Sequence, residues 1–183
     1  QVSTCLYNIG LVYKQYENYE KALEFYGKSL KIEEDQGNKR NIAFSLMGMG
    51  SVYSKQNKQN KAIKLLRRAL IIFTEIEDST HVSSCLNNLG DSSLLSENYS
   101  LALKYYEEAL KINLKNTFQS STSHSYLRIG EIYYRNNELK KALSNVLNSQ
   151  KISIKYQYLE YQKEAYELLS KIYYESKKYK KAY

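Results

Sequence analysis

The chain has 183 residues, 43% of them hydrophobic, and a formal net charge of +8. It contains no proline and only seven glycines, so long helices can run without interruption. Its apolar runs are only a few residues long, which argues against a membrane-spanning helix. No secretory pattern stands at the start, and we expect a cytoplasmic location.

The positive charge has two interpretations. A basic surface is typical of proteins that bind nucleic acid. Lysines that coat the outer faces of amphipathic helices would give the same net charge. The lysines are scattered through the whole chain, for example at Lys21, Lys61, Lys104 and Lys140. This scatter favours the second interpretation, so nucleic acid is the least favoured partner.

The strongest pattern is a repeat of 40 residues. Glycine recurs at this spacing at Gly10, Gly50, Gly90 and Gly130. Alanine does so at Ala22, Ala62, Ala102, Ala142 and Ala182. A fixed period of this length indicates a stack of similar small units, each burying its apolar face against its neighbours. We therefore expect an all-α solenoid whose function is to bind along a surface rather than to catalyse a reaction in a pocket.

Each unit is predicted to be a pair of antiparallel helices, and the predicted repeats span residues 3–42, 43–82, 83–122, 123–162 and a truncated 163–183. In the first unit, Leu6, Ile9 and Tyr13 lie on one helical face. After a polar break, Tyr26 and Leu30 mark the second helix. The same pattern then recurs in each later unit.

The fifth unit stops soon after its first helix, at Ala182 and Tyr183. A free solenoid needs polar ends, yet Leu169, Ile172 and Tyr173 are expected to face water here. We therefore expect the chain to be a piece of a longer polypeptide. The sequence begins with Gln1 rather than Met, so it does not exclude an upstream signal peptide.

Two local signals predict where helices begin and end. Gly37 suits the left-handed end of a second helix. Asp78 suits the N-cap of the helix that follows it. Cys5 and Cys85 stand in equivalent registers two periods apart, roughly 20 Å if each unit adds one helix diameter, which is too far for a disulfide. That register holds small residues throughout, so we expect it to require small size rather than thiol chemistry.

The motif Leu-x-x-(Ile/Leu/Met)-Gly-x-x-Tyr, followed by Ala about nine residues later, resembles the tetratricopeptide repeat. The stretches Leu6–Tyr13 and Asn18–Leu23 carry it most clearly. Proline, usual at the end of the second helix, is replaced by Glu34, Thr74, Leu114 and Ile154. The period is also 40 rather than 34 residues, as in the 40-residue variants of the family. The resemblance implies a right-handed superhelical solenoid of about 4.5 repeats.

The sequence offers little for catalysis or metal binding. His81 and His124 stand in different registers, and neither a His-x-x-x-His pair nor a Cys-x-x-Cys motif exists. The carboxylate pairs Glu33–Glu34 and Glu107–Glu108 are predicted to lie on solvated outer faces. We expect neither an enzyme nor a metal or cofactor site. Most of the 20 tyrosines fall in packing registers, but Tyr7, Tyr134 and Tyr174 could face a groove.

In the family that this chain resembles, the first helices line a concave groove that binds a protein or an extended peptide. The matching positions here are Asn8, Ser51, Lys55, Asn87, Asn88, Asp91, His124, Arg128, Glu131 and Arg135. Asn8 and Asn88 match a family asparagine that pairs with peptide backbone, and Arg128 could hold a carboxylate through two hydrogen bonds. In the alternative interpretation, the asparagines only satisfy neighbouring backbone groups.

Three functions remain open from the sequence. The first is a peptide-binding or protein-binding module of a bacterial signalling protein, because the last unit resembles the end of repeat arrays that precede kinase, cyclase or DNA-binding domains. The second is a segment that dimerises, through exposed solenoid ends, and transmits a signal. The third is a basic scaffold for nucleic acid, whose binding would weaken steeply with salt.

Overall fold

The computed structural model describes the backbone of residues 1–181 and the side chains of residues 1–177, and every element in this range is an α-helix. The predicted all-α class is therefore confirmed. The expected repeat positions Ala182 and Tyr183 lie outside the described residues. Among the described helices, none combines the length and apolarity that crossing a membrane requires.

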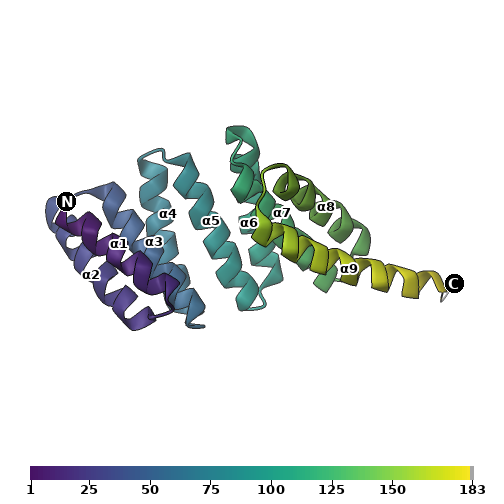
Figure 1. Ribbon diagram of the computed structural model, residues 1–183. Coiled ribbons are helices and arrows are strands. Elements are labelled where there is room, and N and C mark those ends of the chain that lie inside the picture. The colour runs from purple at the N-terminus through teal and green to yellow at the C-terminus, as the bar shows by residue number, and fades with distance from the viewer. Residues whose placement is uncertain (182–183) are drawn as a thin grey trace. The chain divides into compact units, whose positions relative to one another are not determined.

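The chain divides into two compact units, and the first comprises Gln1–Asn98. Its helices are α1 (Val2–Gln15), α2 (Tyr19–Gln36), α3 (Lys39–Lys55), α4 (Gln59–Glu75) and α5 (Ser79–Leu95). Each helix packs on the next along the chain, and α3 also contacts α1 and α5 (Figure 1). The contacts are those of stacked helix pairs, with the first helices α1, α3 and α5 forming one layer.

The second unit comprises Tyr99–Tyr183. Its helices are α6 (Tyr99–Asn116), α7 (Gln119–Arg135), α8 (Leu139–Lys155) and α9 (Leu159–Lys181). Helix α8 packs on both α7 and α9, and α7 also contacts α9. The first helices α7 and α9 are therefore neighbours, as α1 and α3 are in the first unit.

A left-handed residue ends each of the first eight helices. These residues recur every 20 positions, at Glu17, Gly37, Asn57, Glu77, Glu97, Thr117, Asn137 and Gln157. The following N–H donates back to the helix, as Asn18 does to the carbonyl of Tyr13 at 2.9 Å. This turn ends helices without proline, and two 20-residue halves produce the period of 40. Helix α9 instead continues through Lys177, which stands in the same register.

The glycine register marks a close approach between the two helices of a pair. A Cβ atom added to Gly10 would lie 2.8 Å from the Tyr26 ring, and one added to Gly130 would lie 2.5 Å from Val146 Cγ2. Both distances are below van der Waals contact, so the large side chain fills the space that the glycine leaves. The Cβ of Gly50 would meet Leu66 in the same way, at 2.7 Å.

Two expectations from the sequence were wrong. Glu33 is buried, with 1% of its surface exposed, whereas Glu34 is exposed as expected. Leu169 and Ile172 do not face water, because they pack in a cluster with Leu127 and Val146. Packing between helices buries Glu33, Leu169 and Ile172, and the residues next to them in sequence do not show this burial. In the small-residue register Cys85 is buried and Cys5 is exposed, and both cysteines are free.

Candidate partner-binding surface

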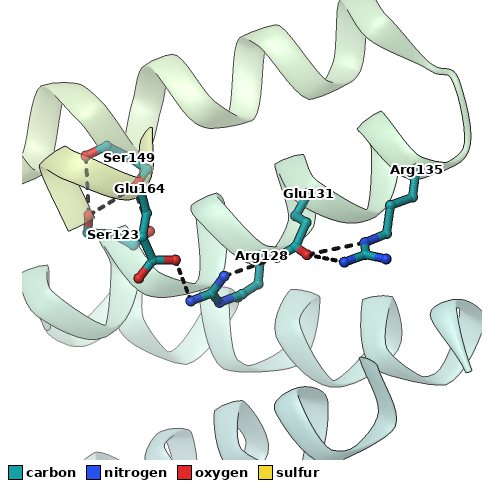
Figure 2. Close-up of polar contacts among 6 residues, drawn as sticks. All are labelled: Ser123, Arg128, Glu131, Arg135, Ser149 and Glu164. Atoms are coloured by element: carbon teal, nitrogen blue, oxygen red, sulfur yellow. Dashed lines mark hydrogen bonds and ion pairs between the residues drawn. The ribbon is translucent and has the colours of Figure 1, made fainter. Parts of the chain in front are cut away.

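A row of alternating charges runs along α7 and onto α9 in the second unit. Figure 2 shows Arg128 between two carboxylates: its Nη1 donates to Glu131 Oε2 at 3.0 Å and its Nη2 to Glu164 Oε2 at 2.6 Å. Arg135 continues the row, donating from Nη2 to Glu131 Oε1 at 2.8 Å. The i, i+3 and i, i+4 spacings place Arg128, Glu131 and Arg135 on one face of α7.

This row borders a groove of about 310 Å³ between α7 and α9. Leu127, Leu168 and Tyr134 contribute apolar surface to it. Glu167 and Lys171 of α9 add charge beside Arg128 and Arg135. Leu127 and Leu168 are only 1% and 9% exposed, so the groove presents charged groups of both signs above a largely buried apolar base. Such a surface can hold a polypeptide that carries charged side chains.

Arg128 is not free to accept a ligand carboxylate without competition. Its two terminal nitrogens already bind Glu131 and Glu164, and its side chain is only 23% exposed. A ligand must displace one of these carboxylates or bind to the paired arrangement.

The hydrogen bonds and the charge of Glu131 raise the pKa of Arg135, although partial burial opposes this. The face of Arg135 also lies over the Tyr99 ring, 5.9 Å from its centroid.

The candidate positions of the first unit differ in accessibility. Asn8 and Lys55 are exposed, and Ser51, Asn88 and Asp91 are half-buried. Asn87 is buried, with 7% of its surface exposed, so it offers little to a partner. Lys55 lies close enough to Lys14 to act on it: burial first, and then the charge of Lys55, lower the pKa of Lys14.

His124 packs between aromatic rings in the second unit. The Tyr106 and Tyr161 ring centroids lie 6.0 and 5.8 Å from its own. The side chain is half-buried, which suits packing as much as partner contact. Among the described residues, His, Cys, Asp and Glu form no cluster of three that could hold a metal ion.

Sequence reasoning missed the α9 half of the groove. Glu164 stands in the register of His124, and Lys171 in that of Glu131. Carrying the 40-residue register into the fifth unit would have identified both. Of the three tyrosines expected to face a groove, Tyr134 lines this one, and Tyr7 lines a second hollow in the first unit. Tyr174 is 69% exposed.

The repeat pattern and the stacked pairs define a class of helical repeat protein. A family model described as a tetratricopeptide repeat matches the chain twice, over residues 1–75 and 41–115. The chain belongs to the tetratricopeptide repeat family. No curated protein matched in the comparison.

Several solved structures share the fold. BtubC (BKLC) from P. vanneervenii has a TM-score of 0.76 and 21% identity, over 85% of this chain and 64% of its own length. Aspartyl phosphate phosphatase F from Bacillus subtilis has a TM-score of 0.87 and 15% identity, over 92% and 44%. A Rap protein complexed with competence and sporulation factor has a TM-score of 0.81 and 18% identity, over 97% and 50%. The chain thus spans between 44% and 64% of these proteins.

Proposed function

We propose that this chain is a non-catalytic module that binds a protein or an extended peptide on the faces of its first helices. The groove between α7 and α9 carries the proposal. It is lined by Arg128, Glu131 and Arg135, three of the positions that the resemblance to the repeat family had selected. Family membership supports the same class of function, since helical repeats present extended binding surfaces.

The chemistry of the groove suits a polypeptide better than a small metabolite. Protein interfaces combine an apolar centre with a polar rim, and here Leu127 and Leu168 lie among charged residues. The arginine–glutamate row fixes the direction of its N–H groups before a partner arrives. A preorganised surface loses less side-chain entropy on binding than a flexible one.

We also propose that the module serves a bacterial signalling protein. Two of the similar folds are an aspartyl phosphate phosphatase from Bacillus subtilis and a Rap protein complexed with competence and sporulation factor. At 15% and 18% identity these names belong to those proteins, and the likeness supports the proposal through the fold alone.

The test compares surface variants against a captured partner. The isolated chain is used to capture proteins from the organism that makes it, and affinities are then measured by calorimetry. Asn88→Ala and Lys171→Ala remove side chains from first helices while leaving the Arg128 ion pairs intact. We expect the double variant Asn88→Ala/Lys171→Ala to bind the partner at least about tenfold more weakly. Lys64→Ala, on the exposed face of α4, should leave the affinity unchanged. Equal affinities for all variants would contradict the proposal.

A second candidate function is self-association through the outer face of α1. Ile9 and Val12 are 39% and 49% exposed, although Ile129 and Ile132 in the same registers of α7 are 3% and 0% exposed. In the later 40-residue repeats, the second helix of the preceding repeat packs against the first helix, as α2 does against α3. We propose that a second copy of the chain packs on this apolar strip of α1.

Light scattering across a range of concentrations tests this candidate. We expect the chain to dimerise and Val12→Glu to abolish the dimer, because the exposed Val12 then carries a charge into the contact. A monomer at every concentration, or a dimer that Val12→Glu leaves unchanged, would rule out this face.

A further inference from the structure

A second hollow, of about 210 Å³, opens on the first unit among α1, α2 and α3. Tyr7 and Phe44 form aromatic walls, with ring centroids 6.0 Å apart. Asn8 and Asn41 contribute amides, and Glu33 of α2 completes the lining. Glu33 is the one charged residue among those that line this hollow.

The Glu33 carboxyl group is buried with incomplete hydrogen bonding. Its Oε1 accepts from the hydroxyl of Ser3 and from Asn41 Nδ2, the latter at 2.9 Å. Its Oε2 is buried and receives no hydrogen bond from any described protein group. A buried carboxylate without a full set of donors is costly, so an external N–H or cation stabilises it strongly.

The packing of the stack does not explain an acidic residue at this position. The same register of the later 40-residue repeats holds Phe73, Asn113 and Ser153, and all three are 0% exposed. The position therefore accepts an apolar ring, an amide or a hydroxyl. Glu33 adds a negative charge that none of its counterparts carries, and it does so beside a hollow.

We infer that this hollow binds the cationic side chain, ammonium or guanidinium, of a lysine or arginine in the bound polypeptide. This rests on the proposed function and adds a specificity site to it. The carboxylate supplies the counter-charge, and aromatic rings such as those of Tyr7 and Phe44 in the lining favour a cation and its aliphatic stem. The volume is below the roughly 300–1,000 Å³ of pockets for drug-sized ligands, which fits one side chain.

The ligand must reach a carboxylate that lines the hollow but whose second oxygen is buried. Asn41 is half-buried and Asn8 is exposed, so both amides have room to change rotamer. Rotation of Asn41 would release Oε1 and give an incoming N–H donor access to the carboxylate. The Asn8 amide oxygen can then accept a second hydrogen bond from the same cation.

Nuclear magnetic resonance titration with small probes tests the site without any peptide. n-Butylammonium and n-butylguanidinium represent the two side chains, and n-butanol is the neutral control, all at constant ionic strength. We expect saturable shifts of the Asn8 and Asn41 side-chain amides with one or both cations, and none with butanol. Glu33→Gln should weaken cation binding at least about tenfold, because it removes the charge and keeps the shape.

Two further variants make the result decisive. Thr4→Phe fills the hollow from an exposed position with the side chain that the same register holds at Phe44, and it should block the cations even if Glu33→Gln fails to fold. Glu20→Gln, on the exposed surface of α2, should change nothing. Absence of saturable binding, an equal response to butanol, or undiminished binding by Glu33→Gln or Thr4→Phe would overturn the inference. Equal partner affinities for the Asn88 and Lys171 variants, together with an intact cation response, would contradict the proposed function and leave the cation site standing.

Discussion

Replacing Arg128 by methionine tests whether the charge row shapes the groove. The change keeps much of the side-chain length but removes two charge-assisted hydrogen bonds, of 3.0 and 2.6 Å. It leaves Glu164 without its arginine partner, whereas Glu131 keeps Arg135. Because the three side chains are 20–31% exposed, the loss should lie between that of surface ion pairs and that of buried ones.

We expect Arg128→Met to lower the free energy of unfolding by about 1–3 kcal/mol. In a chain of this length that lowers the melting temperature by roughly 2–12 °C. Arg135 offers a matched control, because its side chain is 47% exposed and Glu131 keeps Arg128 when it is removed. Arg135→Met should cost about 0–1 kcal/mol.

Urea unfolding followed by circular dichroism measures both variants. Adding Glu164→Gln to Arg128→Met should restore part of the lost stability, because it removes the carboxylate left without a partner. Higher salt should narrow the gap between wild type and variant. An Arg128→Met protein as stable as Arg135→Met would refute the view that these ion pairs order the groove.

Three further predictions concern packing and titration. Gly130→Ala should lower the free energy of unfolding by about 1–3 kcal/mol, because its Cβ would lie 2.5 Å from Val146 Cγ2. The Cβ of Gly27→Ala would meet nothing within 4 Å, so this variant should be more stable by up to about 1 kcal/mol. Thermal melts measure both changes. Burial alone would raise the pKa of Asp78, but hydrogen bonds from His81 and the charges of His81 and Arg40 lower it overall. Its charge therefore stabilises the fold above the unfolded pKa near 4, and the stability lost in Asp78→Asn, measured in urea, should vanish as the pH falls through the folded pKa. Burial, with a contribution from Asp78, raises the pKa of Cys85 to about 12, so a thiol reagent at pH 8 should modify Cys5 quickly and Cys85 far more slowly.

The fold was predictable because the repeat shows the same constraint several times. Gly10, Gly50 and Gly130 each face a large side chain of the second helix, and each reports the same close approach. Gly37 has the left-handed conformation expected of it, with φ of 68°, and Asp78 caps α5 by accepting from the His81 N–H. Periodicity identifies such positions without any knowledge of tertiary structure.

The chemistry of individual positions was less predictable, because it depends on neighbours from other helices. The sequence predicts that Glu33 and Glu34 both face solvent. The structure instead buries the register of Glu33 in each of the first four 40-residue repeats. The sequence predicts that Arg128 can bind a carboxylate of a partner. The packing of α9 on α7 instead brings Glu164 within hydrogen-bond distance of Arg128. A register shows which face a residue occupies, but not which charge lies opposite.

Site-specific photocrosslinking shows directly whether partners bind the first-helix face. A benzophenone side chain replaces Ser51 on α3 or Lys171 on α9, and Lys64 on the exposed face of α4 serves as the control. We expect the two first-helix positions to crosslink to the same partner and Lys64 not to do so. Adducts formed from Lys64 alone, or equally from all three positions, would contradict it.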